Sequence, residues 1–210
     1  MPAAGGDAGF RGFVAVALPD AIRARCARLT EALRPAPARV AWVRPGNLHL
    51  TLKFLGNTRP SQAKRLVGSL THKALKLSPF DVELAGLGAF PSPRRPRIIW
   101  IGVGEGADRL RDLAAKVEGA AAKAGFSREA RPFSPHLTLG RVKMARSRSG
   151  KPSGRPPSEG AAGEDWQALL ARSDPGSFGR FPVGEILLIE SRLTPGGAFY
   201  TPLHRVKLGR

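Results

Sequence analysis

Apolar and polar residues alternate along two short stretches of the chain, NLHLTLKFLG at 47–56 and FSPHLTLGR at 133–141. Such alternation is typical of a β-strand with one buried face, because successive side chains point to opposite sides. In the first stretch the buried face is predicted to carry Leu48, Leu50, Leu52 and Phe54, and the opposite face His49, Thr51 and Lys53.

Both stretches contain the string HLTL, and in each the histidine and the threonine share one face. His136 and Thr138 repeat the arrangement of His49 and Thr51, with about 7 Å between the two residues along each strand. A hydrophobic core has no need of a His–Thr pair, and two accidental copies are not expected in a chain with so few threonines. The repeat therefore predicts that these four side chains form one site.

The rest of the pattern predicts a mixture of helices and strands. Strands are expected at 13–18, 48–55, 80–87, 97–103, 181–193 and 200–208, and the last two are expected to pair through the turn TPGGA. Helices are expected at 20–33, from Ser61 onward with Leu66, Leu70 and Leu77 inward, at 107–124 and at 166–171.

Helices and strands occur twice in a similar order, each time beside an HLTL strand. We therefore expect an α+β fold and a single bilobal domain over residues 1–210. Its two pseudo-symmetric lobes, each an antiparallel sheet with flanking helices, would surround a central cleft across which the HLTL strands face. Residues 143–165 are rich in Ser, Gly, Pro and basic residues, and we expect a disordered basic insertion there.

The charge balance favours an acidic partner. The chain has 34 Lys and Arg against 16 Asp and Glu, a net charge of +18, which suits nucleic acid, although a biased genome would also enrich arginine. The lone Cys26 permits no intramolecular disulfide, as is usual in a reducing cytoplasm, and its spacing places it in the core. The run FVAVAL is too short for a signal peptide or a membrane span. We therefore expect a cytoplasmic protein.

Two histidines on a shared site are suited to concerted acid–base catalysis. One imidazole can take a proton from a nucleophile while the other gives one to a leaving group. Threonine hydroxyls and a nearby arginine can bind the oxygens of an anionic phosphoryl group. Cleavage of a phosphodiester is the chemistry that fits. With no H-E-x-x-H and no Cys/His cluster in the sequence, we expect neither a metal site nor a cofactor.

At these motifs the chain resembles the two-histidine phosphoesterases, and most closely the RNA 2′,3′-cyclic phosphodiesterases of bacteria and archaea, also called 2′-5′ RNA ligases. The resemblance covers nearly the whole chain and includes FRGFVAVALPD, LHLTLKFLG, RPRIIWIGV, PFSPHLTLGR and YTPLHRVKL. It implies that His49 is the proton donor and His136 the proton acceptor. It also implies that Thr51, Thr138 and Arg141 contact the phosphate. Simple alternation places Arg141 on the wrong face, so the strand must end or bulge at Gly140.

The resemblance further implies a reaction and a partner. A monomer would hydrolyse RNA 2′,3′-cyclic phosphate ends, for example on tRNA fragments, to 2′-phosphomonoesters without a metal ion. The reverse step, with a 5′-hydroxyl strand in place of water, would form a 2′-5′ linkage without ATP. The long basic segment at 143–165 departs from the family pattern and leaves the preferred substrate open.

Other interpretations fit parts of the sequence. GVGEGA at 102–107, with Glu129 further on, formally matches a dinucleotide-binding fingerprint, but Glu129 lies in a polar loop and not at the end of a parallel strand. A non-catalytic RNA-binding protein on the same fold would explain the charge but not the two intact H-x-T pairs. A sister esterase acting on 2′-5′ oligonucleotides or on ADP-ribose cyclic phosphate stays open. His204, in the last predicted strand, could also line the site.

Overall fold

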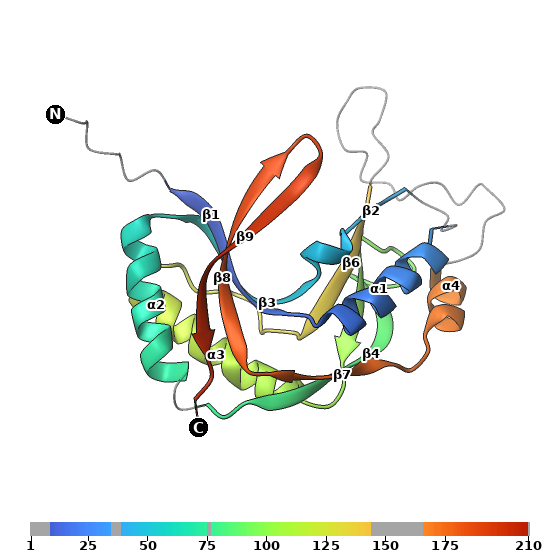
Figure 1. Ribbon diagram of the computed structural model, residues 1–210. Coiled ribbons are helices and arrows are strands. Elements are labelled where there is room, and N and C mark those ends of the chain that lie inside the picture. The colour runs from blue at the N-terminus through green and yellow to red at the C-terminus, as the bar shows by residue number, and fades with distance from the viewer. Residues whose placement is uncertain (1–8, 35–38, 75–76, 144–165, 210) are drawn as a thin grey trace.

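The computed structural model describes residues 9–34, 39–74, 77–143 and 166–209 (Figure 1). The strands are β1 (Phe10–Ala17), β2 (Val40–Trp42), β3 (His49–Thr58), β4 (Phe80–Phe90), β5 (Ile98–Val103), β6 (His136–Val142), β7 (Ser177–Val183), β8 (Glu185–Thr194) and β9 (Gly197–Lys207). The helices are α1 (Asp20–Ala32), the 3-10 helix η1 (Pro45–Asn47), α2 (Pro60–Ala74), α3 (Ala107–Lys123) and α4 (Trp166–Ser173). Residues 144–165, most of the expected insertion, lie outside the described part of the chain.

All described strands form one antiparallel sheet in the order β7-β4-β5-β6-β3-β1-β8-β9, with β2 added beside β6. The sheet falls into two halves. The first lobe holds β3, β1, β8 and β9, and the second holds β6, β5, β4, β7 and β2. The lobes meet where β3 pairs with β6 through the single residue pair Leu50–Leu137. The α+β class and the two lobes are confirmed, but the two expected sheets are continuous with each other, and the HLTL strands are neighbours within them.

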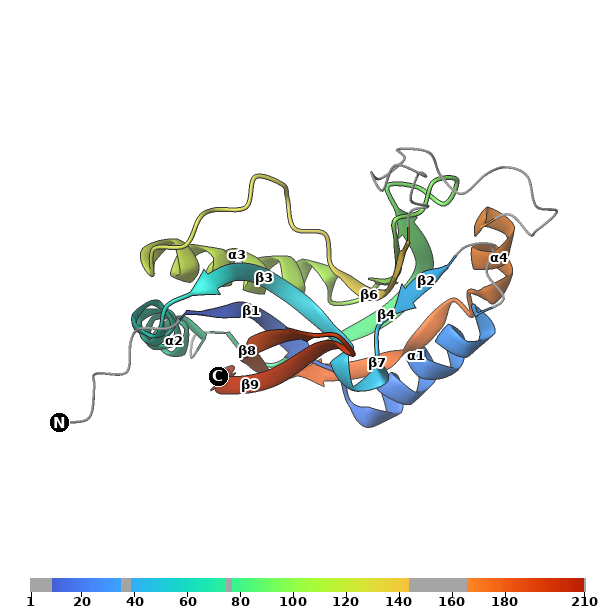
Figure 2. The same cartoon turned by 90° about the horizontal axis from the view of Figure 1, so that it is seen from above.

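Each lobe carries two helices on its leucine side. Helices α2 and α3 pack against the first lobe, whereas α1 and α4 pack against β7 and β4 of the second lobe (Figures 1 and 2). A large apolar core joins these helices to the leucines of both HLTL strands. Cys26 is fully buried in this core, as expected, and burial raises the pKa of its thiol to about 11.

The lobes are interleaved along the sequence. Helix α1 follows β1 of the first lobe but packs on the second, β3 and α2 belong to the first lobe again, and the last two strands, β8 and β9, complete the first lobe after β4 to β7 have built most of the second. The single strand expected at 181–193 is wrong for this reason. It is two strands, β7 and β8, which break at Gly184 and lie in different lobes.

Two shifts of register bend the simple alternation of β3. They fall where β3 pairs with β1, and they leave Leu52 and Leu55 without partners in the ladder. As a result Lys53 turns to the helix side and is 3% exposed, while Phe54 turns away from the core and is 57% exposed. The sheet faces predicted from the sequence for these two residues are therefore wrong, because a bulge moves every later side chain to the other face.

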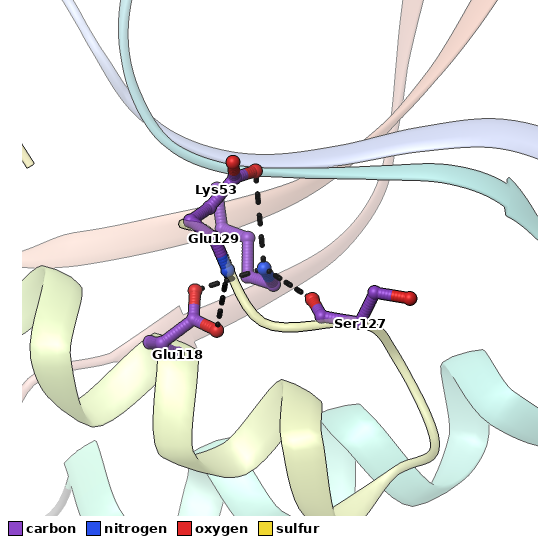
Figure 3. Close-up of polar contacts among 4 residues, drawn as sticks. All are labelled: Lys53, Glu118, Ser127 and Glu129. Carbon is purple, nitrogen blue, oxygen red and sulfur yellow. Dashed lines mark hydrogen bonds and ion pairs between the residues drawn. The ribbon is translucent and has the colours of Figure 1, made fainter. Parts of the chain in front are cut away.

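Lys53 is buried with partners on the helix side of the sheet (Figure 3). Its Nζ lies 2.8 Å from Oε2 of Glu118 on α3 and 4.0 Å from Oε1 of Glu129, and it donates a hydrogen bond of 3.0 Å to the Ser127 carbonyl. The Glu129 amide in turn donates to Glu118. This cluster ties β3 to the loop that leads into β6.

No helix within the described ranges is long and apolar enough to cross a membrane.

Candidate active site

The pairing of β3 with β6 brings the two HLTL strings side by side in opposite directions. Around the pair Leu50–Leu137, antiparallel register sets His49 beside Thr138 and Thr51 beside His136, all four on the face opposite the leucine core. The two histidines are then diagonal neighbours, a relation that spans about 7–8 Å in a regular ladder. The structure thus gathers the four side chains that the sequence singled out.

The two imidazoles are held by matched hydrogen bonds. Nδ1 of His49 lies 2.7 Å from the carbonyl oxygen of Asn47, and Nδ1 of His136 lies 2.8 Å from that of Ser134, two residues upstream in both cases. A carbonyl oxygen only accepts, so each Nδ1 carries the proton that it donates. Nε2 of each histidine is left to exchange a proton with a substrate.

The surroundings of the two imidazoles differ. The His49 ring is stacked on Phe13, with 4.7 Å between ring centroids, and meets the edge of Tyr200 at 5.4 Å. Burial lowers the pKa of His49, and the hydrogen bond to Asn47 offsets part of that shift. The His136 ring meets the Phe90 ring edge-on at 5.1 Å and is the more open of the two. Burial therefore favours the neutral form of His49 in the free protein.

Arg141 reaches the histidine face through the bulge that the sequence required. Leu139 has no partner where β6 pairs with β5, so the alternation shifts and Arg141 is exposed between buried neighbours. Gly140 permits this turn, because a Cβ there would lie 2.6 Å from a methyl carbon of Val40. Burial raises the pKa of the Tyr200 hydroxyl, while the charges of Arg141 and Arg11 lower it. Two cations thus act on the hydroxyl of Tyr200, the residue whose ring meets His49.

Several residues at this face carried no prediction of their own. Phe13 and Tyr200 join Ala15, Leu187 and Ile189 in a small apolar cluster on the histidine side of the first lobe. The signal in the sequence was the run FVAVAL, which is apolar on both faces of β1, as in a strand covered on both sides. Asn47, Phe90 and Trp100 had no comparable signal, since their roles depend on contacts between distant strands.

Two of the other interpretations, a role for His204 in the site and a dinucleotide-binding fingerprint, receive no geometric support. His204 is exposed and pairs with Leu188, a residue of the helix-side core, so it lies on the face away from His49. Helix α3 joins β5 to β6, which are antiparallel neighbours, whereas a dinucleotide fingerprint requires a parallel βαβ unit. Glu129 lies near Lys53 instead. Within the described residues, no three His, Cys, Asp or Glu side chains gather as a metal site would require.

Comparison with known proteins gives consistent matches. The family model described as "LigT like Phosphoesterase" matches residues 16–100 and 101–153. A protein of Methanothermobacter thermautotrophicus named RNA 2′,3′-cyclic phosphodiesterase is 33% identical over 94% of this chain and 98% of its own length. One of Aquifex aeolicus with the same name is 36% identical over 80% of this chain and 81% of its own.

Solved structures agree. A protein of Thermus thermophilus matches with a TM-score of 0.73 and 28% identity, over 95% of this chain and 99% of that one. E. coli LigT in complex with 3′-AMP matches with a TM-score of 0.70 and 28% identity, over 96% and 99% of the two chains.

Proposed function

This chain belongs to the LigT-like phosphoesterase family, and on that premise we propose that it hydrolyses RNA 2′,3′-cyclic phosphate ends to 2′-phosphomonoesters without a metal ion. The observation that carries the proposal is the pair of matched contacts from Nδ1 of His49 and His136 to backbone carbonyls. They present two Nε2 atoms on one face, beside the hydroxyls of Thr51 and Thr138. Related proteins bear the name of this activity.

In the proposed mechanism His136 starts neutral and His49 starts protonated. Nε2 of His136 takes a proton from water as the water oxygen attacks phosphorus, the bond from phosphorus to the 3′ oxygen breaks, and Nε2 of His49 gives its proton to that oxygen. The product is a 2′-phosphomonoester with a free 3′-hydroxyl. The histidines then exchange protons with solvent to regain their starting states.

The remaining side chains would bind the phosphoryl oxygens. Thr51 and Thr138 are hydrogen-bond donors placed symmetrically about the two histidines, and Arg141 adds a cation on the same face. Because burial disfavours the charged form of His49, the negative cyclic phosphate beside it would restore the protonated state on binding. Substrate binding and proton loading would therefore be coupled.

The first prediction is that His49→Ala and His136→Ala each lower kcat/KM on a 2′,3′-cyclic nucleotide by about 10²–10⁴-fold, as for lost general acid or base catalysis. Circular dichroism would verify folding, and every assay would contain excess EDTA. Activity of the unaltered protein in EDTA supports the metal-free mechanism. A folded histidine variant with near-normal turnover would refute acid–base catalysis by the two histidines.

The roles of the two histidines can be separated with a substrate whose 3′ bridging oxygen is replaced by sulfur. A thiolate leaves without a proton, so this substrate should restore much of the rate of His49→Ala and little of the rate of His136→Ala. The opposite pattern would exchange the two roles. A protein that binds such RNA ends but turns over none of these substrates would be a binding module.

Three finer points belong to the same proposal. With a 5′-hydroxyl in place of water as the nucleophile, the same steps would give a 2′-5′ linkage without ATP. The net charge of +18 suits an RNA substrate such as a tRNA fragment. We also propose that the protein works as a cytoplasmic monomer, in keeping with its single, buried cysteine.

A further inference from the structure

Two aromatic side chains of the second lobe, Phe90 and Trp100, lie beside the catalytic strand β6. Trp100 pairs with Thr138 on one side and with Gly88 on the other, so its side chain shares the histidine face. The indole lies across Gly88, where a Cβ would approach it to 2.5 Å. This aromatic pair, as we name Phe90 and Trp100, therefore rests directly on the sheet next to a proposed phosphate contact.

The aromatic pair reaches His136. The two rings are 5.1 Å apart with an interplanar angle of 37°, and the edge of Phe90 meets His136 at 5.1 Å. Both side chains are partly exposed. The indole N–H is buried and, among the described residues, has no hydrogen-bond partner. Trp100 thus contributes aromatic surface to this place and no polar contact.

Exposed basic residues lie beside the aromatic pair. The β4–β5 loop, residues 91–97, follows Phe90 and carries Arg94, Arg95 and Arg97, all exposed. Arg39 and Lys143 are adjacent, because Lys143 donates a backbone hydrogen bond to Arg39, and Val142 donates one to Arg97. None of these five cations forms an ion pair with a carboxylate in the described part of the chain.

We propose that the aromatic pair and the β4–β5 loop form a subsite for a nucleotide with a free 5′-hydroxyl, the group that attacks the cyclic phosphate in place of water. Its base would stack on the aromatic pair, since stacking on an aromatic ring suits any base. The phosphate on its 3′ side would lie among the loop arginines. The inference rests on the proposed function and names the acceptor that the same site takes.

The choice of the acceptor follows from the position of Phe90. Its ring touches His136, which in the proposed mechanism deprotonates the nucleophile, so a base stacked there places its own 5′-oxygen beside that histidine. The 5′-oxygen attacks phosphorus and gives its proton to His136. The bond to the 3′ oxygen breaks, and His49 protonates that oxygen. The product is a 2′-5′ linkage, and no other reactant is needed.

The test is a competition between water and an acceptor. The protein would receive 2′,3′-cyclic AMP with increasing concentrations of the dinucleotide ApA, which has a free 5′-hydroxyl, and 2′-AMP would be measured as the product of water attack. Bound ApA should displace the water and suppress 2′-AMP formation, with or without accumulation of a 2′-5′-linked trimer. ApA phosphorylated at its 5′ end should have little effect, because its charge repels the cyclic phosphate.

The variants locate the subsite. Phe90→Ala should raise the ApA concentration for half suppression about tenfold, the loss expected for one stacked base. Arg94→Gln/Arg95→Gln changes only exposed side chains, so folding is not at risk. This variant should also raise the ApA concentration for half suppression. It should reduce the log–log slope of that concentration against salt by about 0.7 for each phosphate that is no longer bound.

Two matched control variants change residues away from the proposed subsite, on β9 and just after α1. Phe199→Ala removes an exposed ring on the far face of β9, and Arg34→Gln/Arg205→Gln removes the same net charge as the loop variant. Both should behave as the unaltered protein.

Equal suppression by ApA in Phe90→Ala and the unaltered protein, or none in either, would overturn the subsite. Lower 2′-AMP formation in Phe90→Ala with unchanged suppression would make Phe90 a positioning residue for His136. Absence of 2′-AMP in every sample would instead refute the proposed hydrolysis.

Discussion

At the scale of single residues, Asn47 connects His49 to the β8–β9 hairpin. Its carbonyl accepts the hydrogen bond from Nδ1 of His49, while its side-chain amide donates one of 2.8 Å to the carbonyl of Ala198. Tyr200, two residues beyond Ala198, packs against the same imidazole. The hairpin therefore fixes both the ring of His49 and the carbonyl that sets its tautomer, so Asn47 is a positioning residue.

We predict that Asn47→Ala lowers the pKa of His49 below its already depressed value. The carbonyl contact favours the imidazolium and would weaken, whereas burial, which favours the neutral ring, would stay. At a pH above the pKa of His49, lowering that pKa lowers the protonated fraction of His49. The value of kcat/KM near neutral pH should therefore fall by the same factor. Nuclear magnetic resonance titration of the imidazole would measure the shift.

His136 provides the internal control for this titration, because its Nδ1 contact goes to Ser134 and does not involve the hairpin. Its own titration should be the same in both proteins. The charges that act on Tyr200, which packs against His49, come from Arg141 on β6 and Arg11 on β1, and neither is altered by the substitution. Reduced activity with an unchanged His49 titration would contradict the positioning role.

At the scale of elements, bulges decide which side chains reach the site. Alternation alone predicted the faces of His49, Thr51, His136 and Thr138, since those positions precede the bulges in β3 and β6. It failed for Lys53 and Phe54, because no glycine or proline marks the shift at Leu52. It succeeded for Arg141 only with the bulge near Gly140, where glycine gave the signal.

The displaced Lys53 leads to a prediction about stability. Lys53→Met should destabilise the fold by about 3 kcal/mol, because it leaves the Glu118 carboxylate without its buried cation. Adding Glu118→Leu should recover most of that stability, since a buried ion pair replaced by apolar packing often costs little. Urea unfolding of the two single variants and the double variant would give the coupling energy.

Helix α3 offers the comparison for that cycle. Arg111 and Asp108 form an exposed pair one turn apart, and its removal should cost less than about 1 kcal/mol. A destabilisation in Lys53→Met no larger than that of the exposed pair would show that the cluster in Figure 3 is dispensable for stability.

At the scale of the whole molecule, the order of strands could not be derived from the chain. The elements and the two-lobe division followed from periodicity and from the repeated motif, which are local signals. The return of β8 and β9 to the first lobe depends on which edges bury the most apolar surface, and many arrangements share one pattern. The three-residue strand β2 was missed for a related reason, because its pairing with β6 is its main distinguishing feature.

The last prediction concerns the basic segment that follows β6. Residues 146–155 contain Arg146, Arg148, Lys151 and Arg155, outside the described part of the chain. The segment begins just after Lys143, which is fixed beside Arg39 at the end of the strand that carries His136. The segment continues the chain from this place, and we expect its positive charges to meet the phosphates of an RNA longer than one nucleotide.

Deleting residues 146–155 should therefore raise the Kd for RNA that ends in a cyclic phosphate and reduce the salt slope by about 0.7 for each phosphate that the segment had bound. Turnover of 2′,3′-cyclic AMP should change little, since that substrate is too short to meet the segment. Fluorescence anisotropy at several salt concentrations would measure both quantities. Replacing the four basic residues by glutamine at constant length separates charge from length, and it should match the deletion. If the deletion and the glutamine variant both keep the affinity and the salt slope of the unaltered protein, the segment has no part in RNA binding, and cations elsewhere in the chain would account for the electrostatic attraction.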